Sequence, residues 1–123
     1  MIDERYYKGY EGEIEVVIYS GDKKGLKVWE GYFENLLLGC FNGKIKQNGL
    51  LSCWQKRDGF YDEHPWKIPN IELAIGELRQ FAEDRVETDS PQMISSLKQL
   101  KENLLVLLQE SKNKKLDVYI DYN

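Results

Sequence analysis

Alternating apolar and polar positions predict a β-strand near the amino terminus. In residues 13–19, Ile14, Val16 and Ile18 alternate with Glu15, Val17 and Tyr19, and β-branched residues predominate. The next segment, 20–25, is rich in serine, aspartate and glycine, which favour a turn. We therefore expect a strand over 13–19 with one buried face, followed by a turn.

Residues 26–38 fit two structures. Their apolar residues recur at helical spacing: Leu26, Trp29, Phe33, Leu36 and Leu37. Residues 27–30 equally fit the second strand of a hairpin that crosses the preceding turn. We favour a helix, although Gly31 weakens it.

The following region, 44–67, is rich in aromatic residues, glycine and turn formers. Residues 50–55 are interpreted as a short strand, and the Asp-Gly pair at 58–59 is a strong hairpin signal that would send the chain into a returning strand from 60–61. Two prolines exclude a helix over 64–69.

Two helices are predicted in the second half of the chain. Residues 71–84 carry one apolar stripe, with Asn70 as N-cap. Gly76 lies off this stripe, and we expect something to pack closely against it. Residues 90–115 start with Ser90 as N-cap and Pro91 at the first helical position. The apolar stripe there widens in its second half, so we expect that half to be buried on two sides.

Residues 116–122 alternate cleanly and predict a carboxy-terminal strand, with Leu116, Val118 and Ile120 facing the core. We expect this strand to pair with the strand near residue 16. The order of elements predicts a single globular α+β domain over residues 1–123, with a small, mostly antiparallel sheet and helices packed on one face.

The composition limits the partners. The 123 residues include 17 basic and 21 acidic side chains, a net charge of −4, which argues against a protein built to bind nucleic acid or anionic membrane. The apolar runs are far shorter than the roughly 20 residues that span a bilayer, and no secretory signal is present. We expect a cytoplasmic protein.

Candidate chemistry is sparse. Cys40 and Cys53 lack metal-ligand spacing and are interpreted as free thiols, and no phosphate-binding, dinucleotide-binding or metalloprotease motif occurs. We predict no catalytic residue, metal or cofactor. The alternatives are His64 as a general acid or base, and Asp117 with Asp121 as a carboxylate pair on one strand face; a turn histidine and a solvated strand face explain them more simply.

Charge is concentrated in one segment. Residues 57–90 hold 9 acidic and 4 basic side chains, and aromatic residues lie among or beside them. Aromatic side chains beside carboxylates are typical of a surface that binds a basic protein. A solvated helix face with the aromatics in the core is the simpler alternative. The candidate partner-binding residues are Asp58, Phe60, Tyr61, Asp62, Glu63, His64 and Trp66.

In size, acidity and lack of catalytic motifs, the chain resembles the small immunity proteins that bacteria encode beside polymorphic toxins, including those of contact-dependent growth inhibition systems. Residues 49–54 and 59–66 carry the likeness. The resemblance implies that the protein binds one cognate toxin domain, such as a nuclease, and covers its active site.

Two other functions stay open. The apolar face of the 90–115 helix would suit a structural or adaptor subunit that self-associates. A small enzyme using carboxylates or His64 would need a pocket lined by titratable groups.

Overall fold

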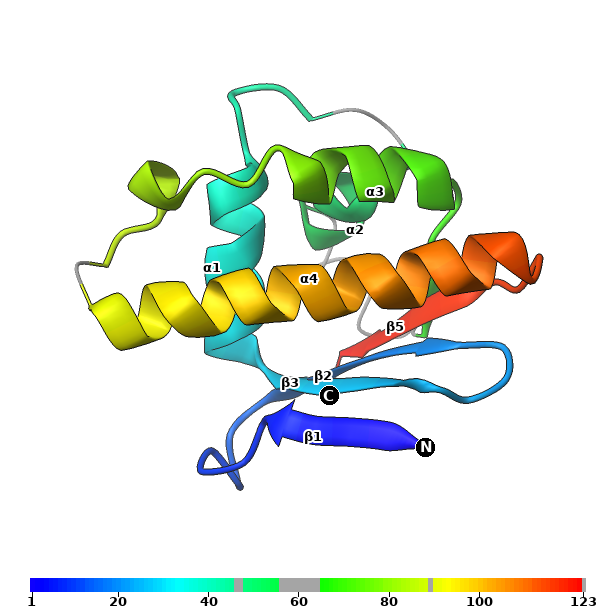
Figure 1. Ribbon diagram of the computed structural model, residues 1–123, viewed down its shortest axis with the longest axis horizontal. Coiled ribbons are helices and arrows are strands. Elements are labelled where there is room, and N and C mark those ends of the chain that lie inside the picture. Colours follow the sequence, from blue (N-terminus) through cyan, green and yellow to red (C-terminus); the bar gives the residue numbers. More distant parts are fainter. Residues whose placement is uncertain (46–47, 56–64, 89, 123) are drawn as a thin grey trace.

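The computed structural model describes residues 1–45, 48–55, 65–88 and 90–122, with Cys53 described by its backbone alone. Five strands form one sheet in the order β1-β3-β2-β5-β4. The helices lie on one side of this sheet, and the long helix α4 (Pro91–Asn113) runs across it (Figure 1). The predicted α+β class, with a mostly antiparallel sheet and helices on one face, is therefore confirmed.

The centre of the sheet is the part that the alternation predicted. Strands β2 (Glu15–Ser20) and β3 (Gly25–Trp29) form a hairpin, and β5 (Val118–Tyr122) pairs antiparallel with β2. The predicted pairing of the last strand with the strand near residue 16 is thus confirmed. One face of these strands is buried, through Val16, Ile18, Leu26, Val28, Val118 and Ile120.

Two predicted strand boundaries were wrong. Ile14 precedes β2 and is 48% exposed, so it is not a core residue. Leu116 precedes β5 and is only half-buried. In both cases the alternation extends beyond the residues that pair with a neighbouring strand.

The sheet edges were not predicted. Strand β1 (Ile2–Tyr6) pairs parallel with β3, and β4 (Trp66–Lys67) pairs antiparallel with β5. Segment 2–6 is mostly polar, and only its last residue, Tyr6, is buried, where its hydroxyl accepts a hydrogen bond from Asn103 of α4. A strand with so little apolar alternation gives no period-2 signal.

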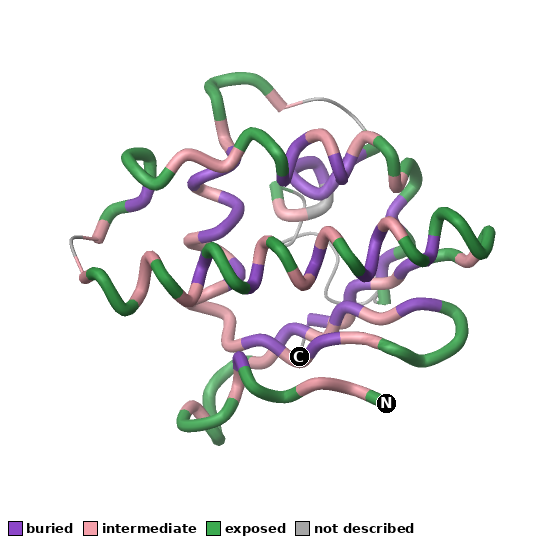
Figure 2. Tube along the Cα trace, viewed as in Figure 1, coloured by how far each residue is buried: buried purple, intermediate pink, exposed green. Residues whose placement is uncertain are grey.

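The segment 26–38 contains both structures that we considered. It runs through β3 to Trp29 and then enters α1 (Glu30–Cys40), so the helix is correct only from residue 30. Figure 2 shows buried residues along α1, along α4 and along the central strands, and those residues form one core cluster.

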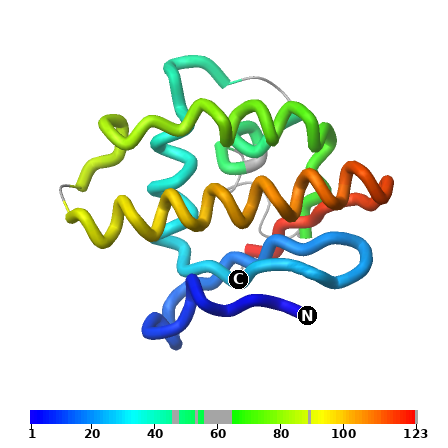
Figure 3. Tube along the Cα trace, in the orientation of Figure 1, coloured from blue at the N-terminus to red at the C-terminus, as the bar shows by residue number. Residues whose placement is uncertain are grey.

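The short helix α2 (Leu50–Gln55) replaces the strand predicted over 50–55, so that prediction was wrong. Helix α3 (Ile71–Arg79) begins at the predicted cap, where Asn70 Oδ1 accepts a hydrogen bond from the Leu73 amide at 3.0 Å. It ends five residues earlier than predicted, and the 3₁₀ helix η2 (Glu83–Arg85) follows (Figure 3).

Helix α4 (Pro91–Asn113) confirms the predicted start, because Ser90 Oγ accepts from the Met93 amide at 3.3 Å. Its leucine stripe lies in the core, through Leu97, Leu100, Leu104, Leu107 and Leu108. Burial of its second half on two sides was wrong, since Val106 is 53% exposed. The expectation that something packs closely on Gly76 was also wrong, because a Cβ there would meet no atom within 4 Å.

Candidate protein-binding surface

Most of the predicted partner-binding residues lie outside the described part of the chain: Asp58, Phe60, Tyr61, Asp62, Glu63 and His64. The seventh, Trp66, belongs to β4 and is 6% exposed. Its ring stacks on that of Tyr122 at 6.1 Å between centroids. Trp66 therefore contributes to the core of the domain, because it lies opposite Ile120 on the buried face of the sheet.

The described carboxylates of segment 57–90 do not gather on one surface. Glu72 lies in the first turn of α3 and pairs with Lys112 at 3.4 Å. Glu83 belongs to η2, beyond the other end of α3, and pairs with Lys98 at 2.7 Å. Glu77 is buried. Trp54 is half-buried and packs against the core.

Aromatic rings gather instead at the end of the sheet where β3 meets α1. The rings of Tyr10 and Trp29 stack with centroids 4.0 Å apart and planes 5° apart. Tyr32 meets both rings edge-on, at 5.5 Å and 5.2 Å, and its hydroxyl lies 3.3 Å from that of Tyr10. We call Tyr10, Trp29 and Tyr32 the aromatic cluster; all three are half-buried.

Glycines make the aromatic cluster possible. A Cβ on Gly31 would lie 2.3 Å from the Trp29 ring, so the ring can cover the first turn of α1 only because residue 31 has no side chain. In the connection from β1 to β2, Gly9 and Gly12 adopt φ of +95° and +94°, which L-residues rarely adopt. These turns bring Tyr10 back over Trp29.

Three carboxylates lie beside the aromatic cluster. Glu11 and Glu13 are exposed on the β1–β2 connection that carries Tyr10, and Glu15 starts β2 opposite Trp29. Two cations lie nearby: Lys8 interacts with Glu11, and Lys27 Nζ lies 3.1 Å from Glu15 and 3.5 Å from Glu4. The hydrogen bond to Glu15 raises the pKa of Lys27.

Tyr122 connects the sheet to two further carboxylates, Glu30 and Glu34 of α1. Its hydroxyl lies 2.6 Å from Glu30 Oε2 and 3.2 Å from Glu34 Oε1, and it donates its single hydrogen towards them. Burial, followed by the hydrogen bond to Glu30, raises the pKa of Tyr122 far above its usual value. This contact holds both glutamates on the side of α1 that faces Tyr122, whereas Tyr32, two residues from each along the helix, projects from the other side.

The aromatic cluster and the three glutamates beside it, Glu11, Glu13 and Glu15, form the candidate surface. Half-buried tyrosine and tryptophan rings offer large contact area with little loss of side-chain entropy, and carboxylates attract a cationic partner. Sequence reasoning missed this surface because Tyr10 and Trp29 are far apart in the chain. The Trp-x-Gly-Tyr sequence at 29–32 was the available local signal.

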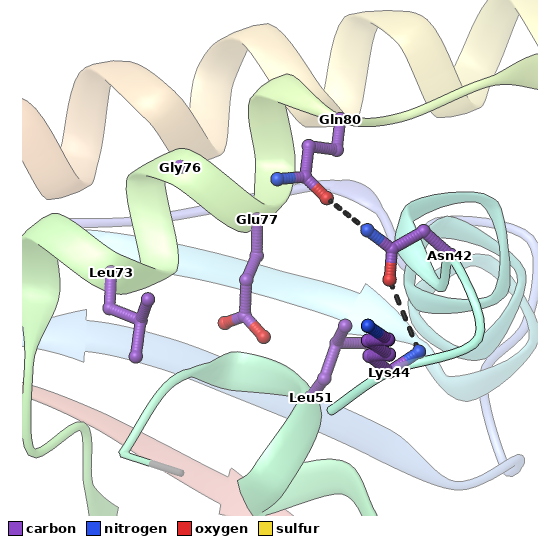
Figure 4. A pocket seen from close by; sticks show the side chains of 7 residues that line it. All are labelled: Asn42, Lys44, Leu51, Leu73, Gly76, Glu77 and Gln80. Atoms are coloured by element: carbon purple, nitrogen blue, oxygen red, sulfur yellow. Dashed lines mark hydrogen bonds between the residues drawn. The ribbon is translucent and has the colours of Figure 1, made fainter. Parts of the chain in front are cut away.

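A second feature is a small hollow of about 120 Å³ on the helical side of the molecule (Figure 4). It lies between α3 and the segment that leads from α1 to α2. Asn42, Lys44, Leu51, Leu73, Gly76, Glu77 and Gln80 line it.

The deepest ionisable group of this hollow has a structural role. Glu77 Oε1 accepts the amide hydrogen of Leu50, the first residue of α2, at 2.7 Å. A Cβ on Gly49 would lie 2.0 Å from the same oxygen, so only glycine permits this approach. The long-range cap explains why residues 50–55 are helical despite their apolar, strand-like sequence.

Within the described ranges, no group of three His, Cys, Asp or Glu side chains is placed to hold a metal ion. Burial raises the pKa of Cys40 to about 12, so this thiol is protonated at neutral pH and is a poor nucleophile. Asp117 lies outside β5 and is exposed, whereas Asp121 is half-buried on β5.

Comparisons with known proteins found no matching family model, no matching curated protein and no matching solved structure. In the part of the chain that the structure describes, no helix is both long and apolar enough to cross a bilayer.

Proposed function

We propose that this protein is an immunity protein, which binds a cognate bacterial toxin domain and neutralises it. The observation that carries the proposal is the aromatic cluster with Glu11, Glu13 and Glu15 beside it, at the end of the sheet where β3 meets α1. This surface combines the two features expected of the contact site, although it lies outside the segment in which the sequence placed them.

The negative charge of the surface favours a partner with a basic surface. A domain that cleaves nucleic acid carries a basic cleft, and a carboxylate-rich surface complements that cleft and accelerates association. The rings of Tyr10 and Trp29 would supply the apolar contact once the charges have oriented the two proteins. Covering the cleft would exclude the substrate and block the toxin.

Self-association through α4 has less support in the structure. The leucine stripe that would carry it faces the core, and Val106 is the large apolar residue that this helix leaves exposed. A single exposed valine is ordinary for a protein surface.

The direct test is to produce the chain together with the protein encoded by the adjacent gene. We expect the two to co-purify as a complex, and we expect the chain to suppress the toxicity of that protein in cells. Failure to bind the adjacent gene product, with both proteins folded, would overturn the proposal.

Charge-reversal variants test whether the toxin contacts the aromatic cluster. Glu13→Lys changes an exposed carboxylate of the β1–β2 connection, and Asp84→Lys makes the same charge change at an exposed position in η2. We expect Glu13→Lys to slow association several-fold at low salt and Asp84→Lys to have a much smaller effect. Equal effects would show that the aromatic cluster is not the contact site.

A further inference from the structure

The hollow beside Gly76 has no part in the proposed contact with a toxin. It lies near the carboxy-terminal end of α1, whereas the aromatic cluster lies at the opposite end of that helix. Any role for it is therefore independent of the surface discussed above.

Helix α3 has two different faces. Its apolar stripe, Ala74, Ile75 and Leu78, is buried in the core. A second stripe, at the spacing i, i+3, i+4 and i+7, lines the hollow: Leu73, Gly76, Glu77 and Gln80. The hollow is thus a feature of one helix face and the segment opposite it, as Figure 4 shows.

Gly76 keeps this face open. It lies in the interior of α3, its φ is not positive, and a Cβ would meet no atom within 4 Å. Neither backbone strain nor close packing therefore explains a glycine at this position, which lowers helix stability. The consequence of its missing side chain is unfilled space above the helix.

The residues that line the hollow determine which class of ligand would fit in it. Leu51 and Leu73 form apolar walls, and the Gln80 amide provides the hydrogen-bonding group. Gln80 Oε1 already accepts from Asn42 Nδ2 at 3.0 Å, and Figure 4 shows the Gln80 amide nitrogen on the side of Gly76 and Glu77. That nitrogen can donate to a carbonyl or hydroxyl oxygen of a ligand.

Size and charge restrict the ligand further. A cavity of about 150 Å³ accommodates benzene, so the present volume of about 120 Å³ suits a molecule of roughly six non-hydrogen atoms. The wall carries one carboxylate, Glu77, and one ammonium group, Lys44, so its charges balance and it favours an ion of neither sign. We propose that this hollow is a binding site for a small neutral molecule with a branched apolar body and one hydrogen-bonding end, of the amide or alcohol class.

Two probes of the same shape test the site. Isobutyramide and isobutyrate differ chiefly in charge, and each can be titrated into the full chain while backbone amide signals are followed by NMR. We expect isobutyramide to give saturable shifts centred on Leu73, Gly76 and Gln80, and isobutyrate to give none there. Absence of saturable shifts with isobutyramide, or tighter binding of isobutyrate, would overturn the proposal.

Variants identify the groups involved. Gly76→Leu should fill the space and abolish the shifts, whereas Glu72→Ala on the exposed side of α3 should leave them unchanged. Gln80→Met keeps the length of the side chain and removes its amide, and we expect it to weaken isobutyramide binding several-fold. Unchanged binding in both Gly76→Leu and Gln80→Met would show that the probe binds elsewhere.

Discussion

Single residues in this fold are best understood from the atoms that surround them. Gly31 and Gly76 are both helical glycines, yet the first lies under the Trp29 ring and the second under open space. Their sequence contexts do not distinguish them. The difference predicts opposite effects of the same substitution.

Gly31→Ala should displace the Trp29 ring and disturb its stack on Tyr10, because the new Cβ would lie 2.3 Å from that ring. We expect the free energy of unfolding to fall by about 1–2 kcal/mol. Urea unfolding followed by tryptophan fluorescence measures both the stability and the ring environment. An unchanged emission spectrum with unchanged stability would contradict the packing described here.

Gly76→Ala should stabilise the protein by about 1 kcal/mol, since alanine favours a helix interior and its Cβ meets no neighbour. The same urea unfolding experiment provides the comparison with Gly31→Ala. A loss of stability would mean that residue 76 is more tightly enclosed than the structure shows.

Cys40 is a third case, because burial decides its chemistry. Its pKa is raised to about 12, mainly by burial and secondarily by the charge of Glu77. In a Cys53→Ser background, we expect alkylation of Cys40 by iodoacetamide at pH 8 to be at least about a hundredfold slower in the folded protein than in urea. Similar rates in the two states would show that the thiol is accessible.

At the scale of elements, one side chain decides the structure of a distant segment. Glu77 of α3 accepts a hydrogen bond from the first amide of α2 and is only 6% exposed. A six-residue helix is too short to be stable by itself. Its stability must therefore come from this cap and from the burial of Leu50 and Leu51.

Glu77→Ala should destabilise the protein by about 2–3 kcal/mol, because it leaves a buried amide without its acceptor. We expect hydrogen exchange in α2 to accelerate more than in α4. Glu72→Ala is the matched control on the same helix, because Glu72 is exposed and its ion pair with Lys112 lies at the surface. Equal losses for the two variants would argue against the capping role.

At the scale of the whole molecule, two weakly acidic side chains, the Cys40 thiol and the Tyr122 hydroxyl, make the free energy of unfolding change with pH in the alkaline range. The pKa of Cys40 is raised from 9.0 and that of Tyr122 from 10.0, so the folded state favours the neutral form of both. Their contribution is fully present below those ordinary values and is lost as the pH rises above them.

We therefore expect the free energy of unfolding to decrease steadily between about pH 9 and pH 11. Tyr122→Phe removes one titrating hydroxyl beside Glu30 and Glu34, and it should make this decrease shallower. Urea unfolding at a series of pH values gives the slopes. Equal slopes for the parent and the variant would show that Tyr122 ionises as freely in the folded state as in the unfolded state.

The sequence by itself determined the elements whose signals are local. The alternation around Val16 and Ile18, the Ser90-Pro91 helix start and the Asn70 cap identify β2, α4 and α3, because these patterns depend only on neighbouring residues. Together with the alternation of β5, they were sufficient for the α+β class and for the pairing of β2 with β5.

Only the tertiary structure decided the features that depend on residues far apart in the chain. Strand β1 is polar and exists because β3 lies beside it, and α2 is helical because a carboxylate 27 residues further along the chain caps it. The aromatic cluster likewise forms because Tyr10 returns to Trp29 through glycine turns. Sequence periodicity records which face of an element is apolar, but it does not record which distant residue that element will meet.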